Sequence, residues 1–290
     1  MEPIFDLESG SARKARARRI ADAGAGFLMQ RAAEDLDDRL AAVERRFDKA
    51  AALYCQTPAA ANVLARSPKV KNVVRVEADV SLVGGEGLVA TDELLPFEPE
   101  SLDLVVSLHS LHEVNDLPGM LIQIRRSLRP DGLFLACLAG AGTLAELREA
   151  LLLAETELHG GVSPRVFPFT DVRDAGALLQ RAGFALPVAD HESVTVRYDS
   201  MFDLMRDLRA MGATNTLAAR SRRPASRALF MRAAQIYAER FSDPDGRIRA
   251  TFATIWLSGW APHASQQQPL KPGSGKVSLA KVLGDSTEDR

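Results

Sequence analysis

Cysteine is scarce in this chain, because its 290 residues include only Cys55 and Cys137. Both lie in stretches typical of strands, and two thiols are too few for a disulfide framework or a structural zinc site. Scarce cysteine suits a reducing compartment. We therefore expect a cytoplasmic protein with an ordinary hydrophobic core, to which 46% of its residues can contribute.

Long apolar runs are also absent. No stretch of the sequence approaches the ~20 consecutive apolar residues that a membrane-spanning helix requires. Residues 13–19 hold five Arg or Lys, and no apolar run long enough for the core of a signal peptide follows them. We therefore expect neither a transmembrane segment nor a cleaved leader.

The sequence has little excess charge of either sign. Its formal net charge of −2 predicts no general affinity for nucleic acids or acidic membranes. The distribution is uneven, however, because the region Arg220–Arg249 contains eight arginines and only three acidic residues. This region is either a solvated helix face or a docking surface for an acidic partner protein.

A strand–helix–strand unit is the best-defined element of the sequence. Leu102–Leu108 is a short apolar run typical of a strand buried on both faces. An amphipathic helix follows, capped by Asn115 or Asp116, before the turn Pro130–Gly132 leads into the strand Leu133–Leu138. This order predicts a βαβ unit with a right-handed crossover.

Strands and helices alternate on both sides of this unit, which predicts a mostly parallel α/β sheet covered by helices. Residues 13–49 have the spacing of one long helix, and 200–241 return to helix behind a capping box at Ser200 and Asp203. Thr251–Trp260 is typical of a late strand. The expected earlier strands are Ala50–Tyr54, Asn72–Glu77, Leu88–Ala90, Leu102–Leu108, Leu133–Leu138 and Ala185–Tyr198.

A second capping box is expected at Thr143 and Glu146, where it would open another helix. That helix leads into Gly160-Gly161 and the turn-rich segment Val162–Pro168. The segment is either a lid over a substrate or plain connecting structure.

Polar residues gather where the strands of the βαβ unit end. Asp92 precedes the strand Leu102–Leu108, and the polar stretch Ser107–Glu113 lies at its carboxyl end. Parallel α/β sheets bind ligands at the carboxyl ends of their strands. These residues therefore predict a ligand-binding rim.

The same region carries a family resemblance. Residues 92–134 read DELLPFEPESLDLVVSLHSLHEVNDLPGMLIQIRRSLRPDGLF. They resemble the second half of class I S-adenosylmethionine-dependent methyltransferases, in which an acid before an LPF turn contacts adenine. Three further segments read LAETELHGGVSPRVFPFTDVRDAGALLQRAGF, VRYDSMFDLMRDLRAMGATN and FATIWLSGWAP. They are similar to the subfamily of the mitochondrial complex I assembly factor, which is related to the malonyl-carrier-protein methyltransferases of biotin synthesis.

The resemblance implies a Rossmann-like sheet of seven strands with a helical insertion before the last one. It divides the chain into a helical extension (1–49), a methyltransferase domain (50–198), the insertion with the last strand (199–261) and a flexible tail (262–290). It also implies S-adenosylmethionine as cofactor. The residues it assigns to the cofactor are Asp79 for the ribose, Asp92, Glu93 and Leu94 for the adenine, and Leu108 and His109 for the methionine end.

One departure from the family concerns the loop after the first strand, where a GxGxG pattern is expected. Here the stretch runs through Tyr54 and Cys55, which the resemblance places beside the cofactor, to Ala60 without a single glycine. Glycine allows a positive φ and lets the backbone approach the cofactor closely. We therefore expect S-adenosylmethionine to be held mainly by Asp79 and Asp92, to bind weakly, or not to bind.

Two histidines are the remaining chemical candidates. His109 and His112, with Glu113, lie close enough in sequence to suggest a metal site, although residues three apart past a strand need not converge. The alternatives are an ordinary histidine at the rim of the site, or His112 as a general base.

Three functions remain open at this level. The first is a methyltransferase that acts on a protein or carrier-bound substrate. The second, implied by the resemblance, is a protein-arginine hydroxylase that supports respiratory complex I. The third is an assembly protein without catalysis.

Overall fold

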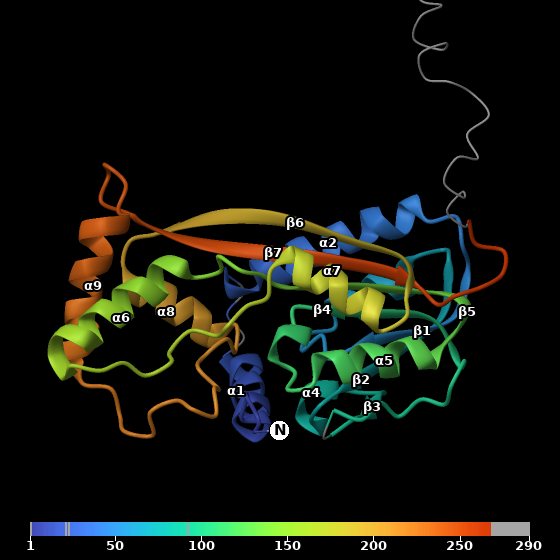
Figure 1. The fold of residues 1–290 in the computed structure, drawn as a ribbon, viewed down its shortest axis with the longest axis horizontal. Helices are drawn as coiled ribbons and strands as arrows, with labels where there is room; N and C mark the ends of the chain where they lie inside the picture. The colour runs from blue at the N-terminus through green and yellow to red at the C-terminus, as the bar shows by residue number, and fades with distance from the viewer. Residues whose placement is uncertain (1, 21, 23, 92, 268–290) are drawn as a thin grey trace, which may run out of the picture.

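The computed structural model describes residues 2–20, 22, 24–91 and 93–267. Within them, seven strands form one sheet of order β3-β2-β1-β4-β5-β7-β6 (Figure 1). The expected flexible tail therefore lies largely outside the described residues. The strands are β1 (Phe47–Leu53), β2 (Val70–Glu77), β3 (Leu88–Val89), β4 (Leu102–Leu108), β5 (Leu128–Ala139), β6 (Ala185–Tyr198) and β7 (Ile248–Trp260).

The sheet is mostly parallel, as the alternation of strands and helices predicts. Strands β1 to β5 pair in parallel, and only β7 runs antiparallel to its neighbours β5 and β6. Strand β1 pairs with β2 on one side and with β4 on the other, so the winding of the chain reverses there. This switch point is where α/β sheets of this kind bind ligands.

Helices cover both faces of the sheet. They are α1 (Leu7–Ile20), α2 (Phe27–Ala42), α3 (Ala59–Arg66), α4 (Val80–Val83), α5 (Leu117–Ser127), α6 (Ala145–His159), α7 (Val172–Arg181), α8 (Met201–Ala210) and α9 (Arg227–Phe241). Alternate residues of one strand enter different cores, because successive strand side chains point to opposite faces. Ala51 and Leu53 pack with residues of α5 and α7, whereas Ala50 and Ala52 pack with residues of α2 and α3.

Strands β6 and β7 extend beyond the rest of the sheet and carry a third core. Their ends contribute Tyr198, Ile248 and Phe252, which pack against α6, α8 and α9. Figure 1 shows these three helices on one side of the molecule and the parallel strands on the other, with α1 between them. Helix α1 is therefore positioned to cover the switch point.

The prediction of one long helix over 13–49 is wrong. Helix α1 ends at Ile20, a short turn of 3₁₀ helix spans Gly24–Gly26, and α2 ends at Ala42. Phe47 is buried because it begins β1 and pairs with Val70. Glycine disfavours a continuous helix, which explains the break that the apolar spacing concealed.

The caps expected at Asp116 and Ser200 are confirmed, because these side chains accept from the backbone amides of Gly119 and Asp203. The capping box expected at Thr143 is wrong. Its hydroxyl donates to the carbonyl of Ala253 and accepts from the amide of the same residue, at 3.0 Å each. Thr143 therefore fastens the start of α6 to β7 instead of capping the helix.

Candidate functional site

Two cavities lie at the carboxyl edge of the sheet. The first, which we call the strand-end cavity, has a volume of about 520 Å³ and lies beside the ends of β1, β2 and β4. Tyr54, Glu77 and Ser110 line it from these three strand ends. Residues of the N-terminal segment, including Lys14 of α1, close it from the other side. A volume of this size is typical of a small-molecule site.

The loop after β1 has the backbone of a glycine-rich loop without its glycines. Tyr54 and Gln56 have φ angles of +52° and +56°, in the left-handed region. These are alternate positions, as in the first two glycines of GxGxG. A left-handed conformation costs a non-glycine residue roughly 1–2 kcal/mol. The backbone of the loop therefore has the left-handed conformation that glycine favours at positions 54 and 56, although both positions carry side chains.

Hydrogen bonds hold both side chains in place. The Tyr54 hydroxyl donates to the carbonyl of Ala90 at 3.1 Å, and burial raises the pKa of Tyr54 to about 12. The Gln56 amide nitrogen donates to the carbonyl of Met211 at 2.9 Å, which links the loop to the end of α8. The Gln56 side chain is thus a fixed part of the cavity wall.

Glu77 ends β2 and is 2% exposed. Burial raises the pKa of its carboxyl, and Arg75, at 2.8 Å, opposes that rise. The other oxygen accepts from the backbone amide of Gln56 at 3.2 Å. Glu77 therefore supports the loop after β1 from beneath.

Asp79, the residue assigned to the ribose, lines the strand-end cavity and caps α4. The amide and the hydroxyl of Ser81 both donate to its Oδ1, at 2.8 and 2.6 Å, and they lower the pKa of the carboxyl. No hydrogen bond to Oδ2 occurs within the described part of the chain. Asp79 thus has one carboxylate oxygen to offer a ligand.

The two described residues that the resemblance assigns to adenine, Glu93 and Leu94, lie in different surroundings. Glu93 lines the strand-end cavity, but its two oxygens accept from the backbone amides of Asn115 and Asp116, at 2.7 and 3.1 Å. Leu94 is 66% exposed and lines neither cavity. Asp92 lies outside the described residues. Of the two members of this group that the structure describes, only Glu93 therefore lies beside the cavity.

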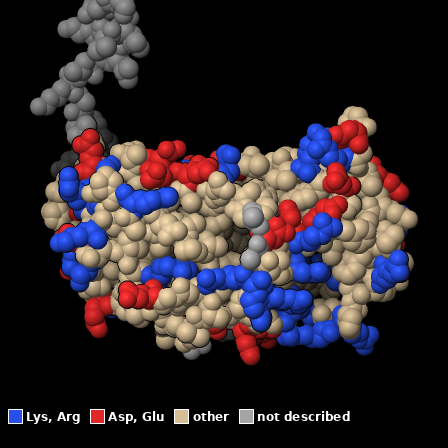
Figure 2. All heavy atoms as spheres, turned by 180° about the vertical axis from the view of Figure 1, so that it is seen from behind, with Lys and Arg blue, Asp and Glu red and all other residues tan. Residues whose placement is uncertain are grey.

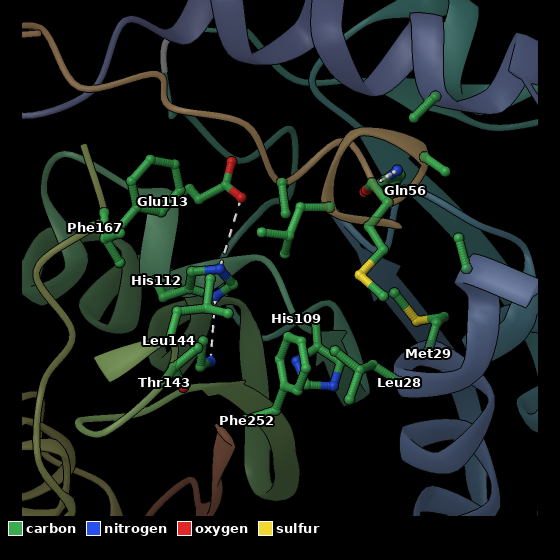
Figure 3. A pocket seen from close by; sticks show the side chains of 18 of the residues that line it. Leu28, Met29, Gln56, His109, His112, Glu113, Thr143, Leu144, Phe167 and Phe252 are labelled. Carbon is green, nitrogen blue, oxygen red and sulfur yellow. Dashed lines mark hydrogen bonds and ion pairs between the residues drawn. The ribbon is translucent and has the colours of Figure 1, made fainter. Parts of the chain in front are cut away.

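The second cavity, which we call the apolar cavity, has a volume of about 300 Å³ and lies between the sheet and the helical side of the molecule. Its walls are mainly aliphatic and aromatic, and the residues labelled in Figure 3 include Leu28, Met29, Leu144, Phe167 and Phe252. His109 and His112 also line it. His109 is therefore in this cavity and does not line the one where the resemblance put the methionine end of the cofactor.

Both histidines are neutral near physiological pH, because burial lowers the pKa of each to about 4. The amide of Ala139 donates to Nδ1 of His112 at 3.4 Å, so the neutral ring carries its proton on Nε2. That Nε2 lies 3.7 Å from a carboxylate oxygen of Glu113. His112 thus suits hydrogen-bond donation to a bound group better than proton abstraction.

Gln56 and Glu113 line both cavities and form the junction between them. The Glu113 carboxylate forms an ion pair with the ammonium group of Lys14 of α1 at 2.8 Å, and the Glu113 side chain is 12% exposed. A group that passes from one cavity to the other must therefore meet an amide, a carboxylate and an ammonium group.

Cys55 and Leu108 line neither cavity, because both are fully buried in the core behind the loop. The sulfur of Cys55 accepts from the amide of Leu108 at 3.4 Å, and burial raises the pKa of the thiol to about 12. A thiol with so high a pKa is a poor nucleophile. These two residues stabilise the loop from within.

Sequence reasoning missed Gln56, Glu77 and the pair of Lys14 with Glu113. Gln56 could have been found, since it occupies a family glycine position. The contact of Lys14 has no local signal, because its partner is 99 residues away in the sequence. In the part of the chain that the structure describes, no group of three His, Cys, Asp or Glu side chains is arranged to hold a metal ion.

The sheet order and the strand-end cavity define a class I methyltransferase fold. A family model described as a methyltransferase domain matches residues 48–136. A protein of Bacillus halodurans C-125, whose name proposes a methyltransferase, has a similar structure with a TM-score of 0.55 at 16% identity; the match covers 79% of this chain and 98% of that one. This chain is therefore a class I methyltransferase-fold protein.

Two groups of relatives narrow the comparison. The mitochondrial arginine-hydroxylase NDUFAF5 of Dictyostelium discoideum is 46% identical over 197 residues, which are 68% of this chain and 45% of the relative. A malonyl-[acyl-carrier protein] O-methyltransferase of Laribacter hongkongensis is 37% identical over 187 residues, which are 64% of this chain and 60% of the relative. The chain thus spans about half the length of the curated relatives that it matches.

The comparisons overturn one expectation. The NDUFAF5 relatives are named as mitochondrial, which points to mitochondria and makes the prediction of a cytoplasmic protein wrong. That prediction relied on scarce cysteine and the lack of apolar runs, neither of which separates the two locations. Every helix among the described residues is too short or too polar to cross a bilayer.

The fold is one whose family binds S-adenosylmethionine. The residues of this chain fit that cofactor only in part. Asp79 and the strand-end cavity suit a nucleoside, because the free oxygen of Asp79 can accept from a hydroxyl. The positions that should cradle the amino-acid end carry the side chains of Tyr54 and Gln56 instead of bare backbone. These residues therefore suit the nucleoside end of the cofactor better than its amino-acid end.

Proposed function

We propose that this methyltransferase-like protein binds a side chain of a protein or carrier-bound substrate in the apolar cavity and supports the assembly of respiratory complex I. We further propose that it binds S-adenosylmethionine only weakly. One observation carries the proposal: the Gln56 side chain is held at the junction of the two cavities, where cofactor and substrate would meet.

The size and lining of the apolar cavity support a side chain as its occupant. Its volume of about 300 Å³ accommodates an aliphatic chain, and most of its lining residues are aliphatic or aromatic. His112 can donate a hydrogen bond from Nε2 to the polar end of such a chain. Asp79 and Glu93 remain the proposed contacts for a nucleoside in the neighbouring cavity.

The relatives supply the biological setting of this proposal. The similarity to NDUFAF5 proteins supports a role with complex I, and the similarity to a malonyl-carrier-protein methyltransferase supports a substrate attached to a larger carrier. Both are proposals here, because this chain covers only part of each relative.

A second proposal is that the junction binds an arginine side chain for hydroxylation, and Glu113 favours that binding. The oxidant, molecular oxygen, and the two electrons that reduce its second atom to water would come from outside this chain. This carboxylate lies at the junction of the cavities and already holds the ammonium group of Lys14. A guanidinium group could replace that ammonium, since carboxylates bind guanidinium groups through paired hydrogen bonds. The relative from Dictyostelium discoideum is named an arginine-hydroxylase.

One experiment tests these proposals together. The chain is deleted in the organism that encodes it, and assembled complex I is quantified with and without expression of the native chain. Mass spectrometry of the complex I subunits then distinguishes a methyl group, an added oxygen and an unmodified residue. We expect complex I to fall on deletion and to recover with the native chain. An unchanged amount of complex I would contradict the proposed role.

A further inference from the structure

A third cavity, which we call the arginine cleft, lies on the helical side of the molecule. It has a volume of about 500 Å³ and is formed by α1, the segment after α6 and the segment between α8 and α9. Figure 2 shows Lys and Arg side chains gathered along the lower edge of this side. The arginines that line the cleft are Arg13, Arg165, Arg220, Arg222 and Arg223.

Positive charge exceeds negative charge in the cleft. Arg165 pairs with Glu155 at 2.7 Å, and Arg220 and Arg222 share Asp6, at 2.8 and 3.4 Å. The other two have no carboxylate partner in the described ranges. Five guanidinium groups thus face two bound carboxylates, which leaves a surplus of three positive charges.

Of the cleft arginines whose side chains have a hydrogen-bond partner, Arg13, near Arg220, is the least compensated by negative charge. Its guanidinium donates to the hydroxyl of Thr214 at 2.7 Å, a neutral partner. Burial and the nearby charge of Arg220 both lower the pKa of Arg13. An anion bound in the cleft would raise the pKa of Arg13 again, because its negative charge would stabilise the charged guanidinium group.

The cleft adjoins the apolar cavity. Arg165 and Asn215 line both of them, so a ligand in the cleft would lie next to one in the apolar cavity. Four other arginines of the Arg220–Arg249 region are paired: Arg232 and Arg240 with Glu157 and Glu149 of α6, and Arg247 and Arg249 with Asp245 and Asp243. Most of the surplus charge of this region therefore lies in the cleft, beside the proposed substrate site.

We propose that the arginine cleft binds an acidic segment of the protein substrate, next to the residue that enters the apolar cavity. This inference rests on the proposed function, since it specifies the substrate. The surplus charge is spread over three separate segments of the chain and a volume of about 500 Å³. Such a spread matches several carboxylates along an extended peptide better than one compact phosphate group.

Fluorescence anisotropy with a labelled peptide tests this inference. The probe carries four glutamates, a short spacer and one arginine, and a second probe has glutamines in place of the glutamates. We expect the full chain to bind the glutamate peptide at least tenfold more tightly than the glutamine peptide, with an affinity that falls as salt is added. Equal binding of the two peptides would overturn the inference.

Two double variants locate the binding. The first is Arg222→Glu with Arg223→Glu in the cleft. The second is Arg66→Glu with Arg126→Glu, which changes the net charge equally at exposed residues of α3 and α5. We expect the affinity for the glutamate peptide to fall at least tenfold in the first variant and less than about twofold in the second. Equal losses, or displacement of the peptide by low-millimolar inorganic phosphate, would also overturn the inference.

The result is separable from the proposed function. Circular dichroism of both variants shows whether each is folded at the assay temperature. If the peptide binds but deletion of the chain leaves complex I unchanged, the proposed function is contradicted and the inference that the cleft binds an acidic segment is supported. If complex I depends on the chain but the acidic peptide does not bind, only the inference about the cleft fails.

Discussion

The variant Gln56→Gly tests whether the side chain at position 56, and not the backbone conformation of the loop after β1, limits cofactor binding. Glycine removes a conformational cost of about 1–2 kcal/mol at φ +56°, but adds roughly 0.5–1 kcal/mol of entropy to the unfolded chain. The lost hydrogen bond to Met211 contributes about 0.5–1.5 kcal/mol. These effects nearly cancel, so the free energy of unfolding should change by less than about 1 kcal/mol.

Cofactor affinity should change far more than stability. Without the side chain, the backbone at position 56 can approach a ligand in the strand-end cavity, and we expect S-adenosylmethionine to bind at least about tenfold more tightly, or 1.4 kcal/mol. Isothermal calorimetry measures the affinity, and urea titration measures the stability. Gln56→Ala is the matched control, because it loses the hydrogen bond but keeps a Cβ atom and the strained φ.

Gln56→Ala should lower the free energy of unfolding by about 1 kcal/mol and improve cofactor affinity less than glycine does. The reasoning is refuted if the glycine variant binds S-adenosylmethionine no better than the alanine variant. It is equally refuted if glycine destabilises the protein by several kcal/mol, because the loop would then depend on the side chain for its fold.

Three further predictions concern the fold around the site. His109 and His112 have a pKa of about 4 when folded, against ~6.5 when unfolded, so the unfolded state binds more protons between these values. Stability should therefore be full above about pH 6.5 and should fall toward pH 4; equal urea midpoints at pH 7.5 and 4.5 would contradict this. Asn115→Ala removes two hydrogen bonds to Phe5, at 2.8 and 3.2 Å, and should speed amide exchange in α1 selectively; exchange raised equally everywhere would count against it. Ser200→Ala removes the cap of α8 and should cost about 1 kcal/mol by urea titration, whereas Ser200→Thr keeps the hydroxyl that also donates to Asp203 and should cost little.

The sheet could be predicted from the sequence because each strand carries its own signal. Leu102–Leu108 and Leu133–Leu138 are short apolar runs bounded by turn residues, and the structure places strands over both. The helix predicted over 13–49 failed first after Ile20, where glycines follow in the sequence, and again at Phe47, whose burial depends on pairing with Val70. Thr143 failed for the same reason, since its partner Ala253 is 110 residues away.

The site was harder to predict, since it depends on contacts between distant parts of the chain. The sequence showed that the glycines are missing, but it did not show that Tyr54 and Gln56 have a left-handed backbone conformation. The hydrogen bond from Gln56 to Met211 joins residues 155 positions apart, so no local sequence pattern predicts it. Nor did the sequence indicate that α1 covers the strand-end cavity, because its charged residues are typical of a solvated helix.

The central claim is that side chains at the glycine positions of the loop leave this protein only a weak hold on S-adenosylmethionine. Calorimetric titration of the native chain with S-adenosylmethionine tests it most directly. The account predicts a dissociation constant above about 100 µM, or no detectable heat. Saturable binding in the low micromolar range would contradict it.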